Sequence, residues 1–269
     1  MIKELDNFFQ KRNIEYYAVL DYSQAREINP SIIGRESFTP RSIVLFLLPY
    51  YAGRAENLSV YAAARDYHIA IREVTSALID ELLRLYPEAS AKGYGDHSPI
   101  DERDAALRSG LGILGDSGLL INEKYGTYIF VADVITDLTP AELGEEGAAL
   151  EYGRCISCGA CRRACPTGLL RGESSDCLSA ITQRKGELAD SEVELMRKFN
   201  TVWGCDLCQS VCPYNRDPKI TPIDFFREDR IASLTSERLS EMSKSEFNER
   251  AFAWRGRKTV ERNLKLLGY

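Results

Sequence analysis

Hydrophobic positions in the first part of the chain follow a helical period. Apolar residues at helical spacing occupy two short stretches, 2–12 and 100–109, and one long stretch, 59–86. Within 59–86, apolar residues recur at three- and four-residue steps before Pro87, namely at Ile71, Val74, Leu78, Leu82 and Leu85. This spacing predicts one long amphipathic helix over 59–86 that ends before the proline, and shorter helices over the other two stretches.

Three short apolar runs, at 16–20, 41–48 and 127–135, predict β-strands. The last run is apolar at almost every position, which is typical of a strand covered on both faces. Strands mixed with helices predict an α+β domain over 1–147, with acidic, turn-rich residues at its end acting as a linker. A cysteine-rich domain over 148–220 and a helical tail over 221–269 are expected to follow.

Composition and charge narrow the class of protein. The 269 residues are 44% hydrophobic and 28% charged, which argues against disorder, collagen and coiled coil. The longest apolar run, Ile43–Leu48, is far shorter than the ~20 residues of a membrane span, and the N-terminus has no apolar signal segment. We therefore expect a cytoplasmic protein with no membrane partner. The net charge of −6 means that any nucleic acid would need a local basic patch.

The cysteines carry the strongest chemical signal. Residues 155–166 read C-x2-C-x2-C-x3-C-P, the bacterial ferredoxin pattern for 4Fe–4S clusters, and 205–213 contain a second Cys-Pro motif with three cysteines. Cys177 supplies the eighth thiol. Structural zinc and disulfides are the alternatives, but zinc uses two C-x2-C pairs and does not account for the first motif. The spacing predicts two 4Fe–4S clusters.

In ferredoxin topology, the last cysteine of each motif reaches the other cluster. One cluster is then expected on Cys155, Cys158, Cys161 and Cys212. The other is expected on Cys165, Cys177, Cys205 and Cys208. A two-cluster electron carrier needs far fewer residues than this chain has. The 147 residues before the clusters therefore predict a site that uses the electrons.

The N-terminal part holds several weaker candidates. Gly110, Gly112 and Gly115 resemble a dinucleotide-binding G-x-G-x-x-G, but no βαβ unit surrounds them, so a glycine-rich turn is favoured on the residues alone. Asp96 precedes a predicted helix, where an N-cap or turn carboxylate is the simplest interpretation. His68 lies in a segment without the glycine of D-x-H-x-x-G, so no histidine–cobalt bond is expected.

Taken together, these segments resemble the epoxyqueuosine reductase family, whose members complete queuosine at a tRNA wobble position. The resemblance is carried by Arg65–His68, Asp96–Glu102, Gly110–Gly115, Gly204–Asn215 and the tail from Arg255 to Gly268. It implies cobalamin beside two 4Fe–4S clusters. It also implies a nitroreductase-like α/β sandwich followed by a ferredoxin-like domain and a short helical tail.

The resemblance also assigns roles to single residues. Asp96 matches the carboxylate taken as the proton donor, which here takes precedence over the capping interpretation. The segments expected at the cobalamin contribute Arg65, Tyr67, His68, Gly110, Gly112 and Gly115. Two departures stand out: Asp116 occupies the place of a family lysine, and the family continues beyond Tyr269 into helical repeats that bind the tRNA stem-loop.

The expected activity is reduction of epoxyqueuosine to queuosine, with electrons from an external low-potential donor. A basic C-terminal stretch is either a solvated helix face or a phosphate patch, and consists of Arg250, Arg255, Arg257, Lys258, Arg262 and Lys265. Without the repeats we expect weak tRNA binding, or a smaller substrate such as the free nucleoside. A ferredoxin-like electron-transfer protein and another corrinoid reductase, such as a dehalogenase-like enzyme, are the alternatives.

Overall fold

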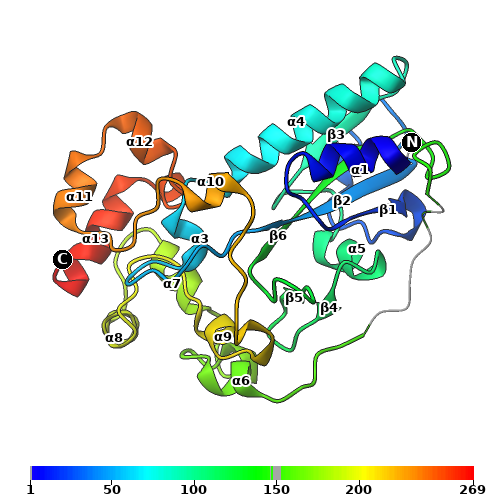
Figure 1. Ribbon diagram of the computed structural model, residues 1–269. Helices are drawn as coiled ribbons and strands as arrows, with labels where there is room; N and C mark the ends of the chain where they lie inside the picture. Colours follow the sequence, from blue (N-terminus) through cyan, green and yellow to red (C-terminus); the bar gives the residue numbers. More distant parts are fainter. Residues whose placement is uncertain (1, 146, 148–152) are drawn as a thin grey trace. The chain divides into compact units, whose positions relative to one another are not determined.

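The structure is a computed structural model that describes residues 2–145, 147 and 153–269 (Figure 1). The chain divides into two compact units. Unit 1 comprises Met1–Pro49 and His68–Ile156, and unit 2 comprises Tyr50–Tyr67 and Ser157–Tyr269. The predicted limits at 147 and 220 differ from this division, because 50–67 belongs with unit 2 and the C-terminal tail is not separate from the cysteine-rich segment. Part of the expected linker lies outside the described residues.

Unit 1 contains a four-stranded antiparallel sheet in the order β1-β2-β6-β3. Its strands are β1 (Tyr17–Asp21), β2 (Ser42–Pro49), β6 (Ile129–Thr136) and β3 (Ala91–Tyr94). The three predicted strands are confirmed to within two residues. No pattern in the sequence indicates β3, because its four residues include a lysine and a glycine and no apolar alternation.

Helices cover both faces of this sheet. Figure 1 draws α1 (Ile2–Gln10) and α4 (Tyr67–Leu85) on one face and α5 (Glu102–Arg108) on the other. The Phe9 ring of α1 lies 5.5 Å from that of Phe46 on β2. The alanines of α5 pack in a buried cluster with the next residues along β2, Leu45 and Leu47, because successive strand residues face opposite sides. The expected α/β sandwich is thus confirmed. A short helix, α2 (Pro30–Ile33), precedes β2.

The predicted helix over 59–86 is wrong in one respect, since it is not continuous. A separate turn of helix, α3 (Val60–Ala63), precedes α4, and Ala64 between them is extended. The Ile231 amide donates to the Ala63 carbonyl, and the Asp66 amide donates to Glu249. These bonds within unit 2 replace the helical bonds that the local sequence favours.

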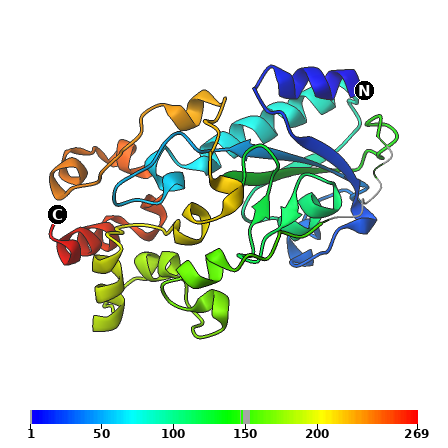
Figure 2. The same ribbon diagram turned by 60° about the horizontal axis from the view of Figure 1, so that its bottom comes forward.

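Unit 2 is built from short helices around Trp203, whose side chain is fully buried. The backbone of Leu58 bridges to Trp203, which brings 50–67 into this core. The predicted helical character of the tail is confirmed, and Figure 2 shows these helices from a second direction. They are α6 (Ala160–Ala164), α7 (Leu178–Gln183), α8 (Asp190–Lys198), α9 (Leu207–Ser210), α10 (Asp224–Arg227), α11 (Ser236–Glu241), α12 (Lys244–Asn248) and α13 (Arg257–Leu267).

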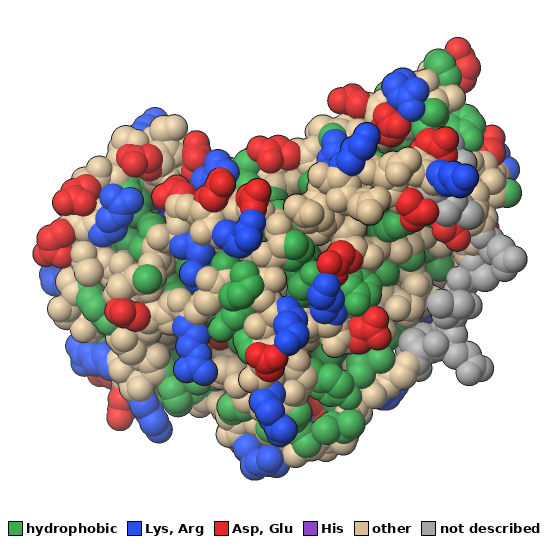
Figure 3. All heavy atoms as spheres, viewed as in Figure 1, with side chains coloured by type: hydrophobic (Ala, Val, Ile, Leu, Met, Phe, Trp, Pro, Cys, Tyr) green, Lys and Arg blue, Asp and Glu red, His purple; other side chains and the backbone are tan. Residues whose placement is uncertain are grey.

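The surface is charged and mixed. On the face drawn in Figure 3, lysines and arginines lie among acidic side chains. Within the described ranges, no helix has the length and apolar character needed to cross a bilayer.

Candidate iron–sulfur and proton-donor sites

None of the eight cysteines, all of which the structure describes, forms a disulfide. Cys155 lies in unit 1, where the Asp116 amide donates to its Sγ at 3.3 Å. The other seven lie in unit 2. Since the contact from Asp116 comes from the backbone, it does not depend on the side chain that replaces the family lysine. Gly159 enters α6 with a φ of 72°, a conformation that glycine adopts at little cost.

Backbone donors surround the thiol of Cys165. Its burial raises the pKa, but the amides of Leu170, Thr167 and Gly168, together with the Thr167 hydroxyl, bring the pKa below the ordinary value. Donors arranged in this way stabilise a thiolate. A thiolate is the form that binds iron.

Two other cysteines lie in an apolar setting. Burial is the largest cause that raises the pKa of Cys205 and of Cys208 to about 12. Cys177 adds to both shifts, Cys165 adds to the first, and Cys161 adds to the second. Cys177, Cys205 and Cys208 therefore lie close enough for their charges to interact, with Cys165 near Cys205 and Cys161 near Cys208. The division of the eight thiols between two clusters stays a prediction. Bound iron would supply the positive charge that these buried thiolates require.

Among the described residues, no group of three or more His, Cys, Asp or Glu side chains is arranged to hold a single metal ion. The iron–sulfur interpretation rests on the cysteine spacing over 155–166 and 205–213.

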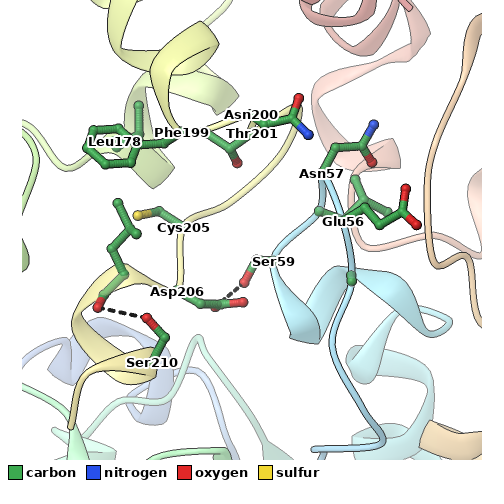
Figure 4. Close-up of a pocket in the computed structure, with 13 residues that line it drawn as sticks. Glu56, Asn57, Ser59, Leu178, Phe199, Asn200, Thr201, Cys205, Asp206 and Ser210 are labelled. Carbon is green, nitrogen blue, oxygen red and sulfur yellow. Dashed lines mark hydrogen bonds between the residues drawn. The ribbon is translucent and has the colours of Figure 1, made fainter.

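The loop that carries Cys205 and Cys208 is held by a buried carboxylate. Asp206 accepts hydrogen bonds from the Ser59 hydroxyl, from the Val60 amide at 2.6 Å and from Gln209 at 3.1 Å. Figure 4 shows the first of these bonds beside Cys205, in a cavity of about 180 Å³. Residues 50–67 therefore support a cysteine loop that lies almost 150 positions later.

Asp96 lies in the loop after β3, in unit 1. Its φ of 64° is left-handed, which a non-glycine residue adopts only under constraint. Its amide donates to Glu102 Oε1 at 2.9 Å, and its Oδ2 lies 3.8 Å from His68 Nε2. The capping interpretation is wrong, because Asp101 is the N-cap of α5 and accepts from the Asp104 amide.

The Asp96 carboxylate is accessible. Its side chain is 66% exposed and that of His68 is 41% exposed, so a substrate or a large cofactor can reach both. This accessibility fits the cobalamin that the family implies. The role of Asp96 as proton donor stays a prediction.

The three predicted glycines have structural reasons of their own. Gly110 ends α5 with a φ of 74°. A Cβ on Gly112 would lie 2.6 Å from the Ile121 carbonyl, within the hairpin of β4 (Ile113–Leu114) and β5 (Leu120–Ile121). A Cβ on Gly115 would lie 3.0 Å from the carbonyl of Leu119. The turn interpretation is thus supported, and their predicted contact with cobalamin is untested.

Arg65 and Tyr67 lie in unit 2. The Arg65 guanidinium lies over the Phe225 ring at 4.4 Å and 3.9 Å from Glu249. The Tyr67 ring meets that of Tyr61 edge-on. Their predicted role at the cofactor also stays a prediction.

Three arginines of the basic tail stabilise the fold. Arg250 is 2% exposed and pairs with Asp229 at 2.6 Å. Arg257 donates to the carbonyls of Leu239 and Met242, and Arg262 donates to that of Arg184. Lys185, Lys258 and Lys265 remain exposed, and the cations that line a surface cavity of about 520 Å³ are Lys185, Arg255, Arg257, Lys258 and Arg262. Fewer cations of the basic stretch are therefore left to contact a phosphate than the sequence indicates.

Two acids near Asp96 had no role assigned from the sequence: Glu102, which ends the Asp96–Glu102 motif, and Asp133, which was not noticed. Asp133 on β6 is fully buried, and burial raises its pKa to about 7. Glu102 opens α5, and burial followed by the charge of Asp133 raises its pKa to about 8. For Asp133, the sequence did offer one signal, namely a single aspartate within an otherwise apolar predicted strand.

Comparison with known proteins agrees with these features. Residues 154–215 match the 4Fe-4S double cluster binding domain. An epoxyqueuosine reductase of Listeria monocytogenes is 31% identical, over 88% of this chain and 65% of its own. The epoxyqueuosine reductase of Cyclobacterium marinum is 30% identical, over 78% of this chain and 69% of its own.

The fold agrees as well. A crystal structure of selenomethionine-labelled epoxyqueuosine reductase superimposes with a TM-score of 0.79 at 25% identity, and the match covers 98% of this chain and 80% of that one. The chain spans less than two thirds of the Listeria relative. With the cluster domain, the sandwich and these relatives in agreement, the chain belongs to the epoxyqueuosine reductase family.

Proposed function

We propose that this chain is a cytoplasmic, cobalamin- and iron–sulfur-dependent reductase that converts epoxyqueuosine to queuosine. The observation that carries the proposal is Asp96, held exposed beside His68 in a chain that also carries the double-cluster cysteines. An electron-transfer protein needs the cysteines alone. A carboxylate constrained at an accessible loop suits an enzyme that delivers a proton.

The eight cysteines and Asp96 have different tasks in the proposed reaction. Cobalamin, when bound, supplies a strongly reducing cobalt centre for the epoxide. The eight cysteines would hold two 4Fe–4S clusters, which would supply single-electron transfer from an external low-potential donor. Asp96 delivers a proton to the departing oxygen, which requires its carboxyl to be neutral at that moment.

The substrate is epoxyqueuosine in tRNA or in a smaller form. A relative at 24% identity, whose likeness to this chain is one of fold, has been solved with an epoxyqueuosine-modified tRNA stem loop. In this chain, three arginines of the basic tail are engaged within the protein. We therefore expect RNA binding through few phosphate contacts, with a shallow dependence on salt.

The test uses protein reconstituted anaerobically with iron and sulfide, with and without added cobalamin. Absorption spectra report both cofactors, and reduction of epoxyqueuosine is assayed in tRNA, in an anticodon stem-loop and as the free nucleoside. Turnover of one of these forms only with cobalamin supports the proposal. Full cluster loading without any corrinoid binding indicates an electron-transfer protein, whereas corrinoid binding without turnover indicates another corrinoid-dependent reduction.

A further inference from the structure

Three carboxyl groups of unit 1 lie within one small region on the α5 side of the sheet. Asp133 pairs in register with Leu45 and Tyr94, and Leu45 belongs to the buried cluster beneath α5. The side chain of Asp133 therefore points toward α5, which begins at Glu102. Glu102 in turn accepts the amide hydrogen of Asp96 at 2.9 Å.

The innermost carboxyl is unusual. Asp133 has zero exposure, and among the described residues neither of its oxygens has a hydrogen bond of normal geometry. The nearby hydroxyl of Ser98 offsets only part of the effect of burial on its pKa. An ionised carboxylate in this position would be very costly, so the neutral acid is the stable form there.

We propose that Glu102 is a positioning residue that holds the Asp96 loop and stores a second proton behind it. This inference rests on the proposed function. It assigns a role to Glu102, an acid that the expected reaction had not used.

The stoichiometry of the reaction calls for such a store. Reduction of an epoxide to an alkene breaks both carbon–oxygen bonds, consumes two electrons and two protons, and releases the oxygen as water. The electrons come from the external donor through the clusters. Asp96 gives the first proton and becomes a carboxylate, and Glu102 then returns a proton to it for the second transfer.

The surrounding charges favour a neutral Glu102. Burial is the largest effect on the pKa of Glu102 and raises it, as does Asp133 from β6 where Asp133 is ionised. The hydrogen bond from the Asp96 amide lowers this pKa, and the charges of Asp96 and of Asp101 on the same helix raise it. Asp101 is itself paired with Arg26. The other titratable groups near this region are Tyr94 of β3, Tyr22, which bonds to Glu27, and His68 beside Asp96.

Glu102→Gln tests the proposal, because glutamine can keep the carbonyl that accepts from the Asp96 amide but cannot store an acidic proton. Glu73→Gln, on the exposed side of α4, is the matched control. We expect Glu102→Gln to keep its clusters and its cobalamin. We expect its turnover to fall ~10²-fold at pH 8, with the loss shrinking toward pH 5, where solvent protons refill Asp96. A loss that is equal at all pH values, or no loss, overturns the proposal.

A second measurement does not depend on activity. Infrared spectra of the cluster-loaded protein at pH 7, without cobalamin, should show the carbonyl band of protonated carboxyls, and Glu102→Gln should remove part of it. An unchanged band overturns the proposal. If the band changes as expected but the wild-type protein reduces no form of epoxyqueuosine, the store is supported and the proposed function fails.

Discussion

Asp133→Asn is expected to stabilise unit 1 in a way that depends on pH. The ordinary pKa of an aspartate is 3.8, and burial raises that of Asp133 to about 7. Between these values the folded protein keeps a proton that the unfolded chain releases. Stability contributed by this group is therefore fully present below about pH 4 and is lost as pH rises toward 7.

The size of the effect follows from the same two values. Each pH unit of difference corresponds to 1.36 kcal/mol, so retaining the proton lowers the free energy of unfolding by up to about 4 kcal/mol above pH 7. Asparagine has nearly the same shape and no proton to lose. The variant should match the wild type near pH 4, within about 1 kcal/mol, and exceed it by several kcal/mol at pH 8.

Denaturant unfolding of the cluster-loaded protein from pH 4 to pH 8 measures this difference. The informative quantity is how the difference in free energy of unfolding between variant and wild type changes with pH. Any fixed effect of the amide on packing is the same at every pH and cancels from this change. A difference of constant size across this range would refute the raised pKa of Asp133.

Three further outcomes are expected. Wild-type protein should bind about eight iron and eight sulfide, and Cys208→Ala should lose about half of each; stoichiometric zinc in place of iron would contradict the cluster assignment. Asp96→Asn should keep both cofactors and lose turnover by ~10²-fold or more, and full activity would exclude its role as proton donor. Asn57→Ala should lower the stability of unit 2 by about 2–4 kcal/mol in denaturant titrations, because it removes two buried bonds to Leu234, and an unchanged midpoint would show that this pairing contributes nothing.

The cysteine chemistry was readable from the sequence because the ligands of each motif lie within a few residues of one another. Spacing over 155–166 reports loop geometry directly. Three of the four strands of the sandwich were also readable, because strands covered on both faces are mostly apolar. Both signals are local, so no knowledge of the fold was needed to find them.

Features that depend on distant partners were not readable. The break after α3 comes from hydrogen bonds to Ile231 and Glu249, about 170 or more residues further along the chain. The basic tail was interpreted as either a solvated helix face or a phosphate patch, because its arginines are close in sequence. Their actual partners are backbone carbonyls and one carboxylate of other segments, which no local pattern reveals.

Asp133 bears on the choice between an enzyme and an electron carrier. A neutral acid without hydrogen bonds in the centre of a sheet lowers stability by up to about 4 kcal/mol at neutral pH, and an apolar residue at that position of β6 would avoid the loss. Transfer of electrons between clusters gives no use for such a group. Transfer of two protons beside an accessible Asp96 does, because it needs acids that remain neutral where exposed carboxyls are ionised. The stability given up at Asp133 therefore favours the reductase over the ferredoxin-like alternative.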